Sequence, residues 1–276
     1  MSFEPDARTQ LFGILGHPVR HSLSPAIHNA AFRAVGLNAV YLAFDVTDLP
    51  GALEGIRALG LKGLSVTIPH KESIIPLLDQ VDPSARAIGA VNTVINRAGV
   101  LAGANTDMTG AVNALEDVVS LERKSVLVLG AGGAARAVCA GLKSKGADVH
   151  IANRTADRAR QIAETFGASW SGLKDLEEVH AAVLVNTTSV GMYPDENEIP
   201  MAPDLLGRFE VVMDIVYSPL ETRLLKEAAG AGCTTVNGLR MLLYQAVVQF
   251  EMWTSIDAPV EAMEKVLRDA VKEADA

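Results

Sequence analysis

The stretch of sequence that decides the fold covers residues 125–143 and reads SVLVLGAGGAARAVCAGLK. Its valine- and leucine-rich start predicts a buried strand, and its end has the apolar spacing of a helix. Between them, Gly130 permits a tight turn, Gly132 leaves room for the backbone to approach a pyrophosphate, and Ala135 is the small variant of the third glycine. A helix that begins near Gly133 directs free N–H groups at that anion. The stretch therefore predicts a dinucleotide-binding unit, and the alternative is a tight turn without a ligand.

The end of the next strand, predicted over residues 148–152, distinguishes between the two nicotinamide cofactors. An NAD site usually has Asp or Glu there, which holds the ribose hydroxyls. This strand instead ends in Asn153, Arg154 and Thr155, and Arg158 follows one helical turn later. A guanidinium can hold a 2′-phosphate with charge-assisted bonds, whereas a carboxylate would repel it. We therefore predict NADP, and the alternative is that both arginines are only solvated residues at a helix start.

Short apolar runs alternate with helical patterns on both sides of this unit. Such alternation is typical of βαβ units and a largely parallel sheet. The predicted strands are residues 11–16, 39–46, 63–68, 182–186 and 210–215, and the predicted helices are residues 24–35, 49–59 and 156–166. Residues 91–95 and 100–104, joined by residues 96–99, predict a hairpin that could add antiparallel strands at one edge of the first sheet.

The chain is long enough for two modest domains, and the pattern restarts after Thr109. We place a domain boundary there. Residues 238–253 are apolar almost all round the projected helix, which predicts a buried helix. This helix lies between the domains or returns to the first one.

Composition narrows the possible partners and locations. The formal net charge of −9 argues against a nucleic-acid partner. Cys139 and Cys233 are too few and too scattered for a disulfide framework or a zinc site, and the six histidines form no metal constellation. Residues 1–6 lack a basic region followed by an apolar run, and no stretch approaches the ~20 apolar residues that span a bilayer. We expect a cytoplasmic protein with no membrane or metal partner.

Polar residues follow two strands of the first domain, where open α/β sheets bind ligands. Ser22 and Ser24 follow the first strand, and their hydroxyls face the same side of an extended segment. Thr67 and Lys71 follow the third strand, and His70 could line the same pocket. Two other interpretations stay open: Lys71 is a solvated surface charge, or Ser24 is a helix N-cap.

A third polar group brackets the hairpin. Asn92 precedes it, and Asn105, Thr106 and Asp107 follow it. On local grounds Asp107 is equally well a cap for the helix that follows.

Taken together, these segments resemble the shikimate dehydrogenase family. They occur in family order over nearly the whole chain, and the one departure noticed is Thr187, where the family more often has alanine. The matching segments are GHP at 16–18, HSLSP at 21–25, SVTIPHK at 65–71, GAVNT at 89–93, NTD at 105–107, GAGGA at 130–134, NRT at 153–155, NTTSVGM at 186–192, residues 214–219, and GLRM at 238–241 with Gln245.

The resemblance implies an α/β fold of two domains with the active site in the cleft. Residues 1–108 would form an N-terminal α/β substrate-binding catalytic domain with a mostly parallel sheet, to which C-terminal helices at 239–276 return. Residues 109–238 would form a Rossmann-type NADP-binding domain.

The resemblance also implies roles for individual residues. Lys71 and Asp107 would be catalytic. The substrate-binding residues would be Ser22, Ser24, Thr67, Asn92, Tyr217 and Gln245. The cofactor-binding residues would be Gly130, Ala131, Gly132, Gly133, Ala134, Asn153, Arg154, Thr155, Arg158, Met213, Gly238 and Met241. The spacing of Gly238, Met241 and Gln245 places them on one helix face, so that face could contact nicotinamide and substrate together.

The implied activity is the reversible NADPH-dependent reduction of 3-dehydroshikimate to shikimate, an oxidoreductase reaction on a CH–OH group in chorismate and aromatic amino acid biosynthesis. The partner would be this small molecule, and the protein would be a monomer or a homodimer. The alternatives are a quinate/shikimate dehydrogenase that uses NAD, and a non-catalytic nucleotide-binding paralogue. Arg154 and Arg158 argue against NAD, and the presence of Lys71 and Asp107 argues against a silent paralogue.

Overall fold

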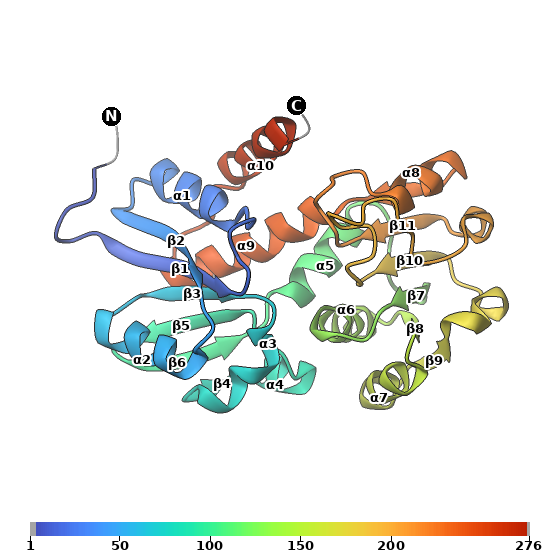
Figure 1. Ribbon diagram of the computed structural model, residues 1–276, viewed down its shortest axis with the longest axis horizontal. Coiled ribbons are helices and arrows are strands. Elements are labelled where there is room, and N and C mark those ends of the chain that lie inside the picture. The colour runs from blue at the N-terminus through green and yellow to red at the C-terminus, as the bar shows by residue number, and fades with distance from the viewer. Residues whose placement is uncertain (1–3, 275–276) are drawn as a thin grey trace. The chain divides into compact units, whose positions relative to one another are not determined.

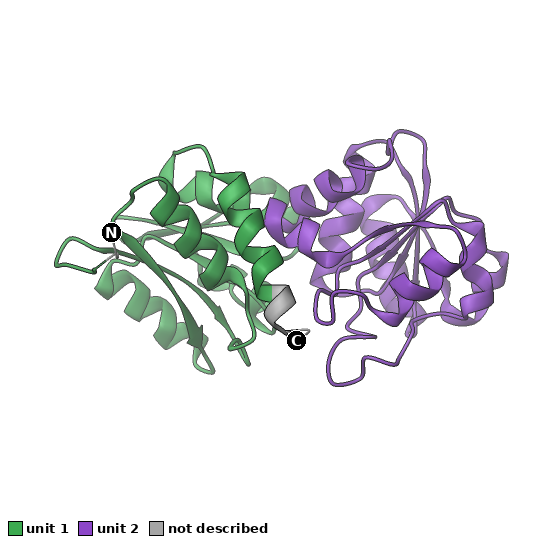
Figure 2. Ribbon diagram, turned by 90° about the horizontal axis from the view of Figure 1, so that it is seen from above, with its two compact units in different colours: residues 1–106, 245–276 green, residues 107–244 purple. Residues whose placement is uncertain are grey.

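The computed structural model describes residues 4–274, of which 271–274 are described by their backbone alone. Residues 1–3 and 275–276 lie outside the described residues. The former belong to the segment in which no signal was predicted, and the latter to the C-terminal helices that were predicted to return to the first domain. The chain forms two compact units, Met1–Thr106 with Gln245–Ala276 (unit 1) and Asp107–Tyr244 (unit 2), which Figure 2 colours green and purple. The chain returns from unit 2 to unit 1 between Tyr244 and Gln245, inside the continuous helix α9 (Gly238–Thr254). A boundary within a helix cannot be predicted from helical periodicity.

Unit 1 contains a six-stranded sheet with the order β2-β1-β3-β5-β6-β4. Strands β1, β2 and β3 are parallel, β5 is antiparallel to both β3 and β6, and β4 is parallel to β6. The strands are β1 (Gln10–Gly16), β2 (Ala39–Asp45), β3 (Gly63–Val66), β4 (Gln80–Val81), β5 (Thr93–Arg97) and β6 (Val100–Ala104). The carboxyl ends of β1, β3 and β6 therefore meet the start of β5 at one edge of the sheet.

The hairpin differs from its prediction in register and in place. Its first strand is Thr93–Arg97 and not residues 91–95, and Arg97 pairs with Val100. The connection is the two-residue turn Ala98-Gly99, and both residues have positive φ, 53° and 90°. A tight turn of this kind matches the right-handed twist of the strands, so it is preferred to the longer loop that we expected. The hairpin also lies between β3 and β4 and not at the edge of the sheet.

Helices cover both faces of the unit 1 sheet (Figure 1). Their bounds are α1 (Ser24–Ala34), α2 (Leu49–Leu59), α3 (His70–Ser73), the 3₁₀ turn η1 (Ile75–Leu77), α4 (Pro83–Ile88) and α10 (Val260–Ala274), together with the second half of α9. On one face, Leu53 and Ile56 of α2 pack on Leu64 and Val66 of β3 in an aliphatic core. On the other face, α1 packs against α10, and rings from α1, α9 and the sheet pack together: Phe12, His28, Phe32, Tyr41, Phe250 and Trp253.

Unit 2 contains a sheet of six parallel strands with the order β12-β11-β10-β7-β8-β9. The strands are β7 (Ser125–Leu129), β8 (Asp148–Asn153), β9 (Ser169–Gly172), β10 (Val183–Asn186), β11 (Val211–Asp214) and β12 (Thr234–Val236). Counted from β7, this is the 3-2-1-4-5-6 order of a Rossmann fold, and the order reverses between β7 and β10. The α/β fold class with a Rossmann-type second domain is thus confirmed.

Two apolar layers enclose this sheet, one on each face. Helices α5, α6 and α7 pack over one face, while the 3₁₀ turns η2 and η3 and helix α8 pack over the other. Their bounds are α5 (Asp107–Glu116), α6 (Gly133–Ser144), α7 (Ala156–Phe166), η2 (Leu173–Glu178), η3 (Pro203–Arg208) and α8 (Arg223–Gly230). Within residues 4–274, none of the helices has the length and apolar character that a membrane crossing would need.

Candidate functional site

The polar loops of unit 1 lie together at the carboxyl ends of the neighbouring parallel strands β1 and β3. The two loops are joined by backbone hydrogen bonds, from Thr67 N to Leu15 O at 3.0 Å and from His17 N to Ile68 O at 3.0 Å. Gly16 makes this contact possible, because a Cβ at this position would lie 2.3 Å from Thr67 Cγ2. The approach of the two loops places Thr67 beside the segment that leads to Ser22 and Ser24.

Ser24 does not cap α1, although the alternative interpretation expected it to. The N-cap residue is Leu23, which forms no side-chain capping bond, and Ser24 is the first helical residue. Ser22 Oγ instead accepts a hydrogen bond from Ser24 N at 3.2 Å. The Ser24 hydroxyl is buried against Tyr41, with which it interacts.

Lys71 lies in the one-turn helix α3, directly after β3. Its carbonyl accepts a hydrogen bond from Val91 N at 2.8 Å, which fixes α3 next to Asn92. Its side chain is half-buried. The neighbouring His70 ring is buried, and its Nε2 lies 2.8 Å from Val46 O.

Asn92 is held rigidly at the start of β5. Its Oδ1 accepts hydrogen bonds from Thr106 N at 2.8 Å and Thr93 Oγ1 at 2.7 Å, and its Nδ2 donates to Thr106 Oγ1 at 3.0 Å. Asn105 Nδ2 donates to Ala90 O at 2.9 Å and joins the same two segments. Asp107 is the next residue of the chain after Thr106, buried in the first turn of α5, where the helix dipole favours a carboxylate.

The buried residues of α9 include two glutamines one turn apart, of which only Gln245 was predicted as a site residue. Gln249 is fully buried and forms hydrogen bonds with Ser65, Thr93 and the backbone of Asn92. An amide side chain one turn after Gln245, in a helix predicted to be buried, was the signal that could have identified it, because buried amides need partners.

The glycine loop of unit 2 has the geometry that a dinucleotide needs. Gly130 has φ of 113°, and a Cβ there would lie 2.5 Å from Thr187 Oγ1. Gly132 is the extended N-cap of the twelve-residue helix α6, and a Cβ added to it would meet no atom within 4 Å. The space beside Gly132 is therefore open at the helix N-terminus, where backbone N–H groups bind phosphates. Ala131 precedes Gly132 in the loop, and Gly133 and Ala134 begin α6, so this segment presents little more than backbone to a ligand.

The end of β8 presents cationic and polar groups in the position that suits a 2′-phosphate. Arg154, Thr155 and Arg158 lie at the start of α7, and Asn153 Nδ2 donates to Thr155 O at 3.0 Å. None of residues 153–155 is acidic. These residues therefore fit NADP.

The other predicted unit 2 residues lie at the end of β11 and the start of α9. Met213 and Met241 are buried in the same apolar core. Gly238 is required at the start of α9, because a Cβ there would lie 2.4 Å from Ile215 O. Tyr217 is partly buried on the turn after β11, and its burial raises the pKa of the phenol.

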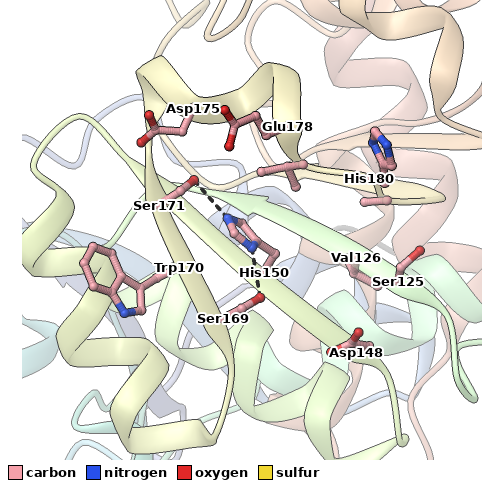
Figure 3. A pocket seen from close by; sticks show the side chains of 12 residues that line it. Ser125, Val126, Asp148, His150, Ser169, Trp170, Ser171, Asp175, Glu178 and His180 are labelled. Carbon is pink, nitrogen blue, oxygen red and sulfur yellow. Dashed lines mark hydrogen bonds between the residues drawn. The ribbon is translucent and has the colours of Figure 1, made fainter.

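A cavity of about 360 Å³ lies elsewhere in unit 2, between η2 and strands β7, β8 and β9 (Figure 3). His150 stands at its centre, with its ring nitrogens 2.9 Å from Ser169 Oγ and from Ser171 Oγ. No predicted site residue lines this cavity. Among the described residues no group of three His, Cys, Asp or Glu could hold a metal ion, and Cys139 and Cys233 are both buried free thiols.

The predicted residues fall into both units, and the predicted catalytic and substrate-binding set is divided: Asp107 and Tyr217 belong to unit 2, whereas its other members belong to unit 1. Ser22, Ser24, Thr67, Lys71 and Asn92 lie around one edge of the unit 1 sheet, and Gln245 is on the α9 half that belongs to that unit. The residues from Gly130 to Arg158 lie at the carboxyl ends of β7 and β8 in unit 2, where a Rossmann fold binds its cofactor.

Three family models match the chain in consecutive segments. They are the shikimate dehydrogenase substrate binding domain over residues 14–94, shikimate/quinate 5-dehydrogenase over residues 112–192, and the shikimate 5′-dehydrogenase C-terminal domain over residues 238–268. The first of these includes Ser22, Thr67 and Lys71.

Relatives and solved structures agree with these matches over nearly the full length. The shikimate dehydrogenase (NADP(+)) of Moorella thermoacetica is 48% identical over 281 residues, which cover 96% of this chain and 95% of the relative. A crystal structure of shikimate dehydrogenase in complex with NADP⁺ is 43% identical, covers 97% of this chain and 98% of that chain, and has a TM-score of 0.92. The enzyme of Thermus thermophilus, in complex with NADP(H) and shikimate, is 41% identical, covers 95% and 100% of the two chains, and has a TM-score of 0.89. The chain belongs to the shikimate dehydrogenase family.

Proposed function

We propose that this chain catalyses the reversible, NADP-dependent interconversion of 3-dehydroshikimate and shikimate. The observation that carries the proposal is the gathering of Ser24, Thr67, Lys71 and Asn92 at one sheet edge of unit 1. Hydroxyl, amide and ammonium groups are the ones that recognise a small polyhydroxylated carboxylate. Strand ends of this kind are where α/β sheets bind ligands.

NADPH, when bound, supplies the hydride, and NADP⁺ accepts it in the reverse direction. The chain's own contribution to this binding lies in unit 2. The backbone of residues 130–134 and the N-terminus of α6 hold the pyrophosphate. Arg154 and Arg158 hold the 2′-phosphate, with Asn153 and Thr155 beside them. Met213, Gly238 and Met241 pack near the nicotinamide.

Lys71 and Asp107 carry out the proton transfer to the substrate oxygen. During reduction the carbonyl oxygen of the substrate gains negative charge, so a nearby donor must stabilise it and give it a proton. The Lys71 ammonium donates that proton and later recovers one from water. Asp107 orients the lysine and accepts a hydrogen bond from the substrate hydroxyl. General acid–base help of this kind contributes about 10²–10⁴ in rate.

The remaining predicted residues bind the substrate. Ser22, Ser24, Thr67, Asn92 and Gln245 hold shikimate, and Tyr217 is near its carboxylate. Residues 1–108 with 239–276 act as the substrate domain and residues 109–238 as the NADP domain. The proposal includes a cytoplasmic location, which two unpaired buried thiols support, and one or two copies of the chain as the working unit.

A direct assay tests this function. Purified protein is mixed with shikimate and NADP⁺, and the formation of NADPH is followed by its absorbance. The proposal expects turnover that saturates in both substrates. Absence of turnover, together with absence of shikimate binding by calorimetry in the presence of NADP⁺, would reject it.

A further inference from the structure

A continuous chain of hydrogen bonds runs through the interior of unit 1 below the predicted substrate residues. Tyr41 Oη donates to Ser65 Oγ at 2.6 Å, and Ser65 Oγ donates to Gln249 Oε1 at 2.8 Å. Gln249 Nε2 donates to Thr93 Oγ1 at 2.9 Å and to Asn92 O at 3.2 Å. Thr93 Oγ1 donates in turn to Asn92 Oδ1 at 2.7 Å, so this hydrogen-bond chain extends from Tyr41 to the Asn92 side chain.

The direction of every bond in this chain is determined by one backbone carbonyl. Asn92 O can only accept, so the nitrogen and not the oxygen of the Gln249 amide must face it. Gln249 Oε1 then faces Ser65, which must donate to it, and the Ser65 oxygen must in turn accept from Tyr41. On the other side, Thr93 accepts from Gln249 and donates to Asn92 Oδ1 at 2.7 Å.

The hydrogen-bond chain lies in the buried interior, where a polar group without a partner lowers the stability of the fold. Tyr41, Thr93 and Gln249 are 0% exposed, and Ser65 is 5% exposed. The His28 ring stacks on Tyr41 with centroids 4.5 Å apart, and burial lowers the pKa of His28 to about 3, so the ring is neutral near pH 7. A low dielectric strengthens each bond of such a network and raises the cost of leaving any member without a partner.

We propose that Gln249 is a positioning residue for the substrate site. It holds the Asn92 end of the site through Thr93 and the Asn92 backbone, joins this end to Tyr41 through Ser65, and thereby sets the orientation of the Asn92 side chain. This role rests on the proposed function, since Asn92 matters for catalysis only if it holds the substrate. Gln249 touches no reacting atom itself.

The main test replaces Gln249 by methionine, which keeps the shape of the side chain and removes its amide. We expect the KM for shikimate to rise about tenfold, because the misaligned Asn92 side chain would lose one or two hydrogen bonds to the substrate. The KM for NADP⁺ should stay within about twofold of the wild-type value. Ser65→Ala breaks the same chain at another link. If the links act together, the double variant should be little worse than Gln249→Met alone.

The matched control is Trp253→Phe, one turn further along α9. Trp253 Nε1 donates to Val94 O at 3.0 Å, so this substitution also removes a hydrogen bond between α9 and the backbone of β5. Trp253 is not a member of this hydrogen-bond chain. Its variant should lower the melting temperature as Gln249→Met does, but leave the KM for shikimate unchanged.

Gln249→Glu gives a second readout that a merely structural residue would not move. A protonated carboxyl can donate one hydrogen bond and accept another, whereas a carboxylate would face Asn92 O with no donor. Burial raises the pKa of such a carboxyl. We therefore compare the KM for shikimate of the variant with that of the wild type at the same pH. The ratio of the two KM values should be lowest near about pH 6 and rise several-fold toward about pH 9.

The outcomes separate the two proposals. Wild-type protein that neither oxidises nor binds shikimate overturns the proposed function, before any variant is compared. Active wild type with a raised KM for shikimate in Gln249→Met, but not in Trp253→Phe, supports the positioning role. Active wild type with equal KM values in both variants, or a Gln249→Glu ratio that is independent of pH, overturns the positioning role alone.

Discussion

Asn186 donates a hydrogen bond from Nδ2 to Asp214 Oδ1 at 3.0 Å and so joins the last residues of the neighbouring strands β10 and β11. Both residues are 0% exposed. Asp214 also accepts from Val216 N at 3.1 Å and from Thr222 Oγ1 at 2.7 Å. This one carboxyl group therefore holds the turn that carries Tyr217.

Replacing Asp214 by asparagine should change the pH dependence of stability. Burial raises the pKa of Asp214 from 3.8 to about 6, although its hydrogen bonds oppose the shift. A group with a raised folded-state pKa contributes stability that is present below the unfolded pKa and is lost as pH rises through the folded pKa. Between these values the wild type should lose about 1.4 kcal/mol per pH unit through this group.

Urea unfolding of both proteins between about pH 4 and pH 7 measures this effect. The free energy of unfolding of Asp214→Asn, minus that of the wild type, should rise with pH over this range. A difference that does not depend on pH would contradict the proposed cost of ionising Asp214.

His28→Asn should shift the pH dependence in the opposite direction. Burial lowers the pKa of His28 from 6.5 to about 3, with a small opposing effect of Gln249. Between these values the unfolded chain binds a proton that the folded chain does not, so the wild type loses stability as pH falls below about 6.5. The variant lacks this loss and should be relatively more stable at low pH, by up to about 1.4 kcal/mol per pH unit. Parallel curves for variant and wild type would mean that His28 takes up its proton normally in the folded protein.

Lys71→Ala should lower kcat by about 10²–10⁴ with little change in the KM for shikimate, as expected for an interaction made mainly in the transition state. Lys62→Ala is a suitable control, because Lys62 is an exposed lysine just before the same strand β3. It should leave both constants unchanged. If Lys71→Ala instead raised KM and kept kcat, the lysine would only bind substrate.

Arg154→Ser should raise the KM for NADP⁺ roughly 10- to 100-fold and leave that for NAD⁺ unchanged, since only NADP⁺ carries the 2′-phosphate and a hydrogen bond to a charged group contributes about 1.5–3 kcal/mol. Arg160→Ser removes another exposed guanidinium from the adjoining helix α7, where it faces Asp157 and Glu164. This control should leave the preference for NADP⁺ unchanged. Equal losses with both cofactors in Arg154→Ser would exclude 2′-phosphate recognition by this residue.

The two loop glycines should separate folding from cofactor binding. Gly130→Ala forces a Cβ into contact with Thr187 at positive φ, so it should lower the melting temperature. Gly132→Ala meets no protein atom, so it should leave the melting temperature unchanged and weaken NADP⁺ binding by calorimetry. Unchanged NADP⁺ affinity in Gly132→Ala would mean that the cofactor backbone does not approach this position.

The sequence predicted the parts of the fold that have strong local patterns. The strand, glycine loop and helix at residues 125–143 lie where we expected them, because apolar periodicity and glycine spacing are local properties. The short strands β4, β9 and β12 were missed because their residues are mostly exposed and form no apolar run, whereas the equally short β3, β10 and β11 are buried throughout. The hairpin register was also wrong, because it depends on the positive φ angles of Ala98 and Gly99.

The buried polar residues were the hardest part of the site to predict from sequence. The Ser24-Pro25 pair has the pattern of a helix cap, yet Leu23 takes the N-cap place and Ser24 faces Tyr41. Gln249 was missed, although it lies one turn after Gln245 in the predicted buried helix. Its partners Ser65 and Thr93 come from strands far away in the sequence, so only the sheet order brings them together. The roles of Lys71 and Asp107 stay predictions, and the Lys71 substitution above tests the first of them.

The measurement that tests the central proposal most directly is the wild-type kcat/KM for shikimate and quinate, each with NADP⁺ and NAD⁺. We expect the shikimate–NADP⁺ pair to exceed each of the other three pairs by at least about tenfold. Arg154 and Arg158 favour NADP⁺ over NAD⁺ through the 2′-phosphate, and the proposed function favours shikimate over quinate. Equal kcat/KM with NAD⁺ and NADP⁺, or a preference for quinate, would contradict this account of the site.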